Sequence, residues 1–215
     1  MSRPYRLRAR ANRQAETRKR IVDAAVDLHR TVGPAWTSLT AVAERAGVSR
    51  PTVYAHFPDL PSLFMACSAA ATAADPWPDP RSWRSIEDPV ARLRHALGEL
   101  YAYYRRNEQL TANILRDLPL LPEVPGRSMA DTTSAMRDAL ATGWRAPSNR
   151  RRLLLAALEH ALDFAAWRSL VRPQSLSDED ATELMVGLVE AAMAGQSGAP
   201  GTGRFQPGRR RNRPN

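Results

Sequence analysis

The sequence predicts an all-α protein with a small N-terminal helix-turn-helix domain and a larger C-terminal helical domain. Three observations support this fold class. Residues 37–57 contain two short segments with apolar residues at helical spacing, joined at Gly47. A Pro-rich segment at residues 75–80 interrupts the helical pattern. Beyond it, apolar residues recur every three or four positions, and no stretch alternates as a strand does.

The most informative element is the helix-turn-helix pattern. Leu39 and Val42 share one face of a first short helix, whose start Ser38 or Thr37 can cap. Gly47 stands where the backbone must leave that helix with a positive φ, and Ser49 can cap a second short helix. The turn has the length that a helix-turn-helix unit requires.

The second helix has the chemistry of a recognition helix, because its N-terminal end is polar. Hydroxyl groups can donate to phosphate oxygens, a guanidinium can bind phosphate or guanine, and a tyrosine ring can contact a thymine methyl group. Val53 and Phe57 are apolar and are expected to pack the domain instead. We expect DNA contacts from Thr37, Ser38, Ser49, Arg50, Pro51, Thr52, Tyr54 and His56.

These residues belong to a longer pattern that resembles the DNA-binding domain of the tetracycline-repressor (TetR) family of bacterial transcriptional regulators. The resemblance runs from about residue 14 to residue 65, about a quarter of the chain. The residues that carry it are Ile21, Ala24, Ala25, Leu28, Gly33, Thr37, Ala43, Ala46-Gly47-Val48-Ser49, Thr52, Tyr54, Phe57, Leu63 and Phe64.

Two positions depart from the family pattern. Pro51 stands where glycine is common, which is harmless in the first turn of a helix. Leu60 replaces a lysine that usually follows the Phe-Pro pair, so one expected phosphate contact is missing. We expect the dipole of the fourth helix to contribute more at that place.

Positive charge is concentrated at the two ends of the chain, whose net charge is +9. Residues 1–20 hold eight Lys or Arg and one Glu, and residues 204–215 hold five Arg and no acidic residue. Release of counter-ions from DNA would favour such ends. We expect residues 1–15 to form a basic arm, entering the minor groove or simply solvated, and residues 197–215 to form a disordered tail. The arm contacts would come from Arg8, Arg10 and Arg13.

The rest of the chain divides into two domains. We expect residues 16–74 to form the DNA-binding domain and residues 75–196 to form a domain for effector binding and dimerisation. Ser148 and Ser177 look like helix caps, and the single Cys67 is expected to be buried. Further helices are expected at residues 89–106, 109–118, 128–144, 149–170 and 177–194.

The last two long helices are expected to form a homodimer through a four-helix bundle. The family resemblance implies a dimer, and one recognition helix reads too few base pairs to be selective. The alternative is that these apolar faces only complete the core of one chain. Gly195 would extend a stripe of small residues on the last helix. The expected interface residues are Leu154, Leu158, Ala161, Leu184, Gly187, Leu188 and Ala191.

The middle helices are expected to enclose a pocket for a small-molecule effector. The density of Tyr and Trp indicates an aromatic, largely uncharged ligand, although each of these side chains taken alone is more often part of a core. The candidate lining residues are Leu97, Tyr101, Tyr104, Asn113, Trp144, His160, Phe164 and Trp167.

Several other classes of function fit the sequence poorly. No apolar run approaches the roughly 20 residues of a membrane span, and no signal-peptide pattern occurs, so we expect a cytoplasmic protein. Glu159, His160 and Asp163 offer acid, base and ligand groups, and Glu159 and Asp163 share a helix face, but His160 points about 100° away from Glu159. We therefore expect no enzyme activity, no cofactor and no metal.

The sequence thus predicts a sequence-specific transcriptional regulator of double-stranded DNA. The family resemblance implies a dimer that represses from a palindromic operator and is released by a ligand, although activation remains open. The alternative is a nucleoid-type protein that binds DNA through its basic ends without reading the sequence.

Overall fold

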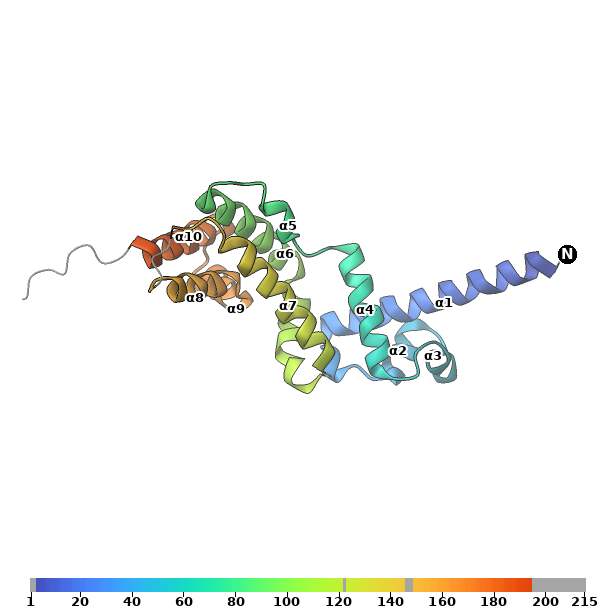
Figure 1. The fold of residues 1–215 in the computed structure, drawn as a ribbon. Coiled ribbons are helices and arrows are strands. Elements are labelled where there is room, and N and C mark those ends of the chain that lie inside the picture. Colours follow the sequence, from blue (N-terminus) through green and yellow to red (C-terminus); the bar gives the residue numbers. More distant parts are fainter. Residues whose placement is uncertain (1–2, 122, 146–148, 195–215) are drawn as a thin grey trace, which may run out of the picture.

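The structure is a computed structural model, which describes residues 3–121, 123–145 and 149–194. All its regular elements in this part of the chain are helical, as predicted, and they form two bodies joined end to end (Figure 1). The elements are α1 (Arg3–Thr31), η1 (Pro34–Trp36), α2 (Leu39–Ala46), α3 (Arg50–His56), α4 (Leu60–Ala74), α5 (Pro80–Trp83), α6 (Pro89–Asp117), η2 (Leu118–Leu120), α7 (Glu123–Leu140), α8 (Arg151–Leu162), α9 (Phe164–Val171) and α10 (Asp178–Ala194).

The N-terminal body packs α1, α2 and α4 around one hydrophobic core, with α3 held by α2. Val53 and Phe57 are buried in it, as predicted, and so is Cys67. Burial raises the pKa of the Cys67 thiol to about 12, so the thiol stays protonated and serves as packing.

Helix α1 corrects the prediction of an arm. Residues 3–15, expected as a flexible segment, are the first part of a continuous helix that projects beyond the N-terminal body (Figure 1). The physical reason is composition, because Arg, Ala, Gln and Leu are strong helix formers and Pro4 lies in the first turn, where proline is tolerated. The lack of an apolar face made this segment look irregular, whereas a polar helix continuous with a packed one needs no such face.

Helix α6 is a single helix where the sequence predicted two. Asn107 has non-helical angles, φ −111° and ψ 17°, and marks a kink rather than a break. Its side-chain amide donates to the Tyr103 carbonyl oxygen (3.2 Å) and to Asp75 at the end of α4 (2.7 Å). The short helix α5 precedes α6 and contains the buried Trp83. The sequence did not predict this helix, because it begins at the last proline of the Pro-rich segment.

The helix expected at residues 149–170 is broken at Asp163, whose ψ of 129° is extended. The Asp163 carboxylate accepts a hydrogen bond from the Ala166 amide (2.7 Å), so the residue caps a new helix, α9. Ser177 caps α10 as predicted, its oxygen accepting from the Asp180 amide (3.0 Å). Ser148 and Gly195 lie outside the described residues.

The C-terminal body has its own core, formed by α6, α7, α8, α9 and α10. This core contains three residues that the sequence placed in a dimer interface, Leu154, Leu158 and Ala161. They are fully buried within one chain and cannot contact a partner. Both faces of α8 carry apolar side chains, and the sequence alone did not tell the inner face from the outer one.

Candidate nucleic-acid interface

Helices α2 and α3 form a helix-turn-helix with defined caps. The Ser38 side chain accepts a hydrogen bond from the Ala41 amide (3.1 Å) at the start of α2. Gly47 ends α2 in the left-handed region, φ 63° and ψ 41°, as its position predicted. The Ser49 side chain accepts from the Thr52 amide (3.3 Å) and caps α3. These caps fix the angle at which α3 leaves the turn.

The turn is tied to α1. Arg20 donates from Nη2 to the carbonyl oxygens of Ala46 (2.6 Å) and Gly47 (3.1 Å). The guanidinium of Arg18 lies over the Phe57 ring, 4.7 Å from its centroid. Two basic residues near the start of the motif therefore serve to hold α3 in place, and the charge pattern gave no sign of this role.

One face of α3 is presented to solvent. Val53 is buried against the core, whereas Arg50 and Pro51 are exposed and Tyr54 is 54% exposed. Thr52 is half-buried, with its hydroxyl 2.8 Å from that of Ser49. One hydroxyl hydrogen is used between these two side chains, which leaves one for a phosphate oxygen.

The remaining predicted contact residues are distributed differently. Ser38 is exposed and His56 is half-buried, so both side chains reach the surface near α3. Thr37 is 3% exposed, and its hydroxyl donates to the Gly33 carbonyl oxygen (2.8 Å). Thr37 therefore stabilises the entry to α2 and is unavailable to DNA, which corrects the prediction. A hydroxyl group just before a helix can cap the helix, contact DNA or form a hydrogen bond inside the protein. Its position in the sequence does not distinguish these roles.

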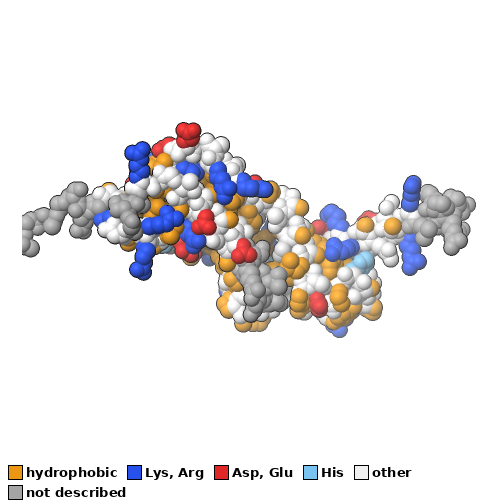
Figure 2. All heavy atoms as spheres, viewed as in Figure 1, with side chains coloured by type: hydrophobic (Ala, Val, Ile, Leu, Met, Phe, Trp, Pro, Cys, Tyr) orange, Lys and Arg blue, Asp and Glu red, His pale blue; other side chains and the backbone are white. Residues whose placement is uncertain are grey.

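Three basic side chains in the N-terminal half of α1 lie in solvent. Arg8, Arg10 and Arg13 are exposed, and Arg13 donates from Nε to the Ala9 carbonyl oxygen (3.2 Å). Lys and Arg side chains flank this part of the helix in Figure 2, at the right. The chain thus presents a basic helix beside an exposed α3.

Comparison with known proteins agrees with this geometry. Residues 21–67 match the family model described as bacterial regulatory proteins, tetR family. Residues 21–67 carry a TetR-family DNA-binding domain. This domain is that of a DNA-binding transcriptional regulator, and regulators of this family are not enzymes. The comparison with curated proteins gives no match.

Solved structures share the TetR fold over most of both chains. A TetR-like regulator from Rhodococcus sp. RHA1 is 21% identical, with a TM-score of 0.56 over 84% of this chain and 97% of that one. NalD, the secondary repressor of the MexAB-OprM multidrug efflux pump in Pseudomonas aeruginosa, is also 21% identical. Its TM-score is 0.55 over 83% of this chain and 97% of NalD. A tetR-family regulator from Streptomyces coelicolor is 21% identical, with a TM-score of 0.54 over 83% of this chain and 79% of that one.

The C-terminal half of α6 is bonded to the body that contains the helix-turn-helix. Asn113 is buried and donates to the carbonyl oxygens of His29 (3.1 Å) and Arg30 (2.7 Å) at the end of α1. The buried Asp117 carboxylate accepts from the Ala35 amide in η1 (3.1 Å). Asn113, predicted to line a pocket, instead forms part of this junction.

His29 at the junction should make stability depend on pH. Burial lowers its pKa to about 4, against the opposing influence of Asp117. The unfolded chain takes up this proton near pH 6.5 and the folded chain only near pH 4, so the free energy of unfolding should fall as pH drops through that window, by up to about 3 kcal/mol. Urea unfolding at pH 7.5, 5.5 and 4.5 should show a smaller decline for His29→Gln. An equal decline in both proteins would contradict this assignment.

Most of the predicted pocket residues are core. Leu97, Tyr101 and Trp167 are fully buried, and Tyr104 nearly so. The Tyr101 and Tyr104 hydroxyls donate to the carbonyl oxygens of Ala161 (2.9 Å) and Leu162 (2.7 Å). Burial raises the pKa of both tyrosines, which remain protonated donors. This aromatic cluster is filled by its own side chains, so the prediction of a pocket within it is wrong.

Phe164 is 6% exposed and belongs to the same aromatic cluster, with its ring 5.2 Å from that of Tyr104, and it also lines a groove between α6 and α9. The other two candidates lie apart. Trp144 is half-buried and donates to the Leu140 carbonyl oxygen at the end of α7, and His160 is exposed. Helical spacing identified side chains that face inward or along a helix, but it could not show which helices leave space between them.

The outer faces of α8 and α10 carry exposed apolar side chains. Leu184 and Leu188 are about half exposed on α10, beside the exposed Gly187 and Ala191. On α8 the exposed large apolar residue is Leu153, whereas the residue predicted for the interface was its buried neighbour Leu154. None of the described helices has the length and apolar character required to cross a bilayer.

Proposed function

We propose that this TetR-family regulator is a homodimeric repressor, which binds a palindromic operator and releases it when a small molecule binds its C-terminal domain. The observation that carries the proposal is the face of α3, with Arg50 and Tyr54 exposed at the end of a firmly capped turn. A dimer places two such helices about one turn of DNA apart, and the operator then mirrors the symmetry of the protein. DNA occupied in this way is closed to polymerase.

We assign residues 16–74 to DNA binding and residues 75–196 to effector binding and dimerisation. The stripe of Leu184, Gly187, Leu188 and Ala191 on α10 supports the second assignment, because small and apolar residues together allow close helix packing. Leu153 on α8 is the exposed apolar residue that would meet it.

Helix α6 supports the coupling between the two functions. Its kink residue Asn107 and its neighbour Arg106 bind Asp75 at the end of α4, while Asn113 and Asp117 bind α1 and η1. A ligand that prefers one arrangement of α6 would therefore bias the position of the DNA-binding domain. A coupling free energy of about 3 kcal/mol would weaken operator binding more than a hundredfold.

The first test is selection of duplexes from a random pool by the full-length protein at about 0.15 M salt, where nonspecific binding is weak. Enrichment of a palindrome is the expected result. Recovery of duplexes without a shared motif would contradict the proposal and favour a nonspecific binder driven by the basic ends.

Tyr54→Ala should weaken binding to the selected site by about 1–3 kcal/mol, through loss of a base or backbone contact. Fluorescence anisotropy with the selected duplex measures this loss. Tyr54→Phe is the matched control, because it keeps the ring and removes only the hydroxyl. Unchanged affinity in the alanine variant would remove Tyr54 from the interface.

Replacing Arg8, Arg10 and Arg13 with glutamine should reduce the salt dependence of binding. Each phosphate contact contributes about 0.9 to the slope of log K against log salt, so the slope should fall by up to about 5 for a dimer. The enriched motif should be the same for the variant and the wild type. Arg81→Gln with Arg84→Gln, on exposed residues of the C-terminal body, should leave the slope unchanged. Loss of all DNA binding in the α1 variant would indicate the nonspecific alternative.

A further inference from the structure

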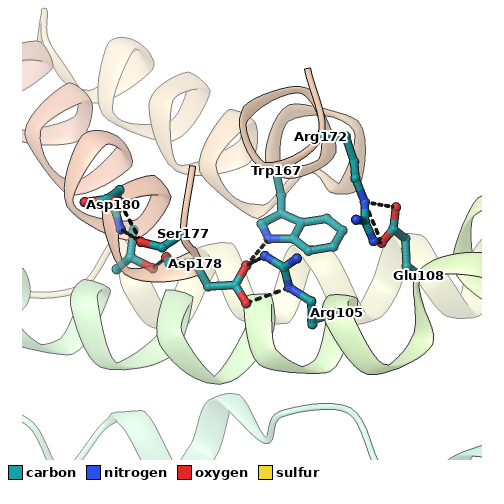
Figure 3. Close-up of polar contacts among 8 residues, drawn as sticks. Arg105, Glu108, Trp167, Arg172, Ser177, Asp178 and Asp180 are labelled. Atoms are coloured by element: carbon teal, nitrogen blue, oxygen red, sulfur yellow. Dashed lines mark hydrogen bonds and ion pairs between the residues drawn. The ribbon is translucent and has the colours of Figure 1, made fainter. Parts of the chain in front are cut away.

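A basic groove of about 970 Å³ lies between the C-terminal half of α6 and helix α9. Its apolar lining includes Ala112, Leu115 and Phe164, and its polar lining includes four arginines. Figure 3 shows two of these, Arg105 and Arg172, beside Glu108 and Trp167. The groove therefore combines an apolar surface with guanidinium groups, a combination suited to a molecule that has both an apolar part and an anionic group.

The arginines of the groove are unequally neutralised. Arg105 binds Asp178 through two hydrogen bonds (3.0 and 2.7 Å), and Arg106 binds Asp75 in the same way (3.0 Å each). The remaining two share a single carboxylate. Among the described residues that line the groove, Glu108 is the one acidic side chain.

Glu108 serves both Arg168 and Arg172. Its carboxylate accepts from the Arg172 guanidinium (Nε at 2.9 Å) and lies 3.3 Å from Nε of Arg168. The Glu108 side chain is 14% exposed, whereas those of Arg168 and Arg172 are 49% and 56% exposed. One positive charge is thus in excess at the rim of the groove, and a guanidinium carries five N–H donors, more than Glu108 can use.

We propose that the groove binds an amphipathic organic anion, with its carboxylate or phosphate held by Arg168 and Arg172 and its apolar part on Ala112, Leu115 and Phe164. The planar fork of each guanidinium matches either anionic group through paired hydrogen bonds. This inference rests on the proposed ligand-controlled function, and it replaces the uncharged aromatic ligand that the sequence predicted.

The place of the groove explains how such a ligand would act. Arg105, Arg106 and Glu108 flank the kink at Asn107, and Ala112 and Leu115 lie on the segment that also carries Asn113 and Asp117. An anion bound between α9 and this segment would bear directly on the helix that holds α1 and η1. A preference of the anion for one angle between α6 and α9 is the differential affinity that a two-state change requires.

The test uses octanoate, octyl phosphate, inorganic phosphate and 1-octanol, titrated into the full-length protein by calorimetry. Either or both of octanoate and octyl phosphate should bind, and which of them does so identifies the preferred head group. Octanol lacks the anionic group and inorganic phosphate lacks the apolar chain. Each of these two should therefore bind at least about 10-fold more weakly than the favoured anionic probe. Glu108→Gln, Arg168→Gln and Arg172→Gln are combined in one variant, so that no carboxylate is left unpaired.

The combined variant should bind the favoured anion about 10- to 100-fold more weakly than the wild type, given the strength of charge-assisted hydrogen bonds. The matched control removes another exposed bidentate pair of α6, through Arg94→Gln with Glu183→Gln, and should bind as the wild type does. Thermal melting should show that both variants are folded. If the combined variant melts early, Leu115→Glu, which introduces a negative charge into the lining, should weaken the anion by a similar factor.

Four results would overturn the inference. The first is that neither anionic probe binds, and the second is that octanol binds as tightly as octanoate. The third is that the combined variant is folded and binds the anion as the wild type does. The fourth is that the combined variant loses a dimer that the wild type forms, which would make the groove a subunit contact. Operator affinity is measured on the same samples without probe. If the wild type does not prefer a palindrome, the proposed function is contradicted. The calorimetric results test only whether the groove binds an amphipathic anion, so the two failures can be distinguished.

Discussion

Gly33→Ala is expected to lower the free energy of unfolding by about 3 kcal/mol or more. Gly33 has a φ of 103°, which an alanine adopts only with strain of about 1–3 kcal/mol. A Cβ atom there would also overlap the side chains of Arg116 and Asp117. The Asp117 carboxylate is buried and bound to the Ala35 amide, so it cannot move aside without losing that bond.

The same change should also loosen the junction between α6 and the DNA-binding domain, because Asp117 is one of the residues that hold it. Urea unfolding gives the stability, and hydrogen exchange of the Ala35 amide reports the junction. Gly98→Ala is the matched control: Gly98 lies within α6 with open space around its Cα, and alanine there should stabilise the protein by up to about 1 kcal/mol. Equal stabilities of the two variants would show that Gly33 tolerates a side chain.

Leu188→Arg is expected to convert the proposed dimer into monomers that remain folded. Leu188 is 44% exposed in the single chain, so arginine is accommodated there without strain. At a twofold interface the same substitution would bring two unpaired charges together in an apolar surface, at a cost of about 3–5 kcal/mol or more. Sedimentation at micromolar concentration measures the change in mass, and operator affinity should fall with it.

Leu120→Arg controls for the substitution itself, since Leu120 is exposed on η2, away from α8 and α10. It should leave both mass and operator affinity unchanged. A dimer that persists in Leu188→Arg would place the subunit contact elsewhere on the surface.

The elements that the sequence predicted well are those with local chemical signals. Ser38, Gly47 and Ser49 specify caps and a left-handed residue through their own side chains or the lack of one, so the helix-turn-helix could be placed closely. The burial of Val53 and Phe57 follows from the same short-range pattern.

The errors concern relations between distant segments. Whether Leu154 or Leu153 faces outward on α8 depends on which side α6 and α10 occupy. The groove depends on the separation of α6 from α9. Arg168 and Arg172 can be recognised as a pair that shares one carboxylate only when the fold brings Glu108, some 60 residues earlier, between them. A spacing of four residues on one helix is common among solvated arginines, and by itself it carries no such information.

The helical state of the N-terminal segment has a consequence for the length of DNA that the protein covers. The stretch from Arg8 to Arg20 contains about 13 residues and, as a helix, measures ~20 Å. That length corresponds to about six base pairs of B-DNA, at 3.4 Å for each. A stiff rod cannot fold back on the half-site as a flexible strand would, so its arginines can meet phosphates only beyond or beside the bases that α3 reads. The nuclease footprint of the dimer should therefore extend past the conserved bases of the operator on both flanks, and that extension should shorten when the rod is truncated.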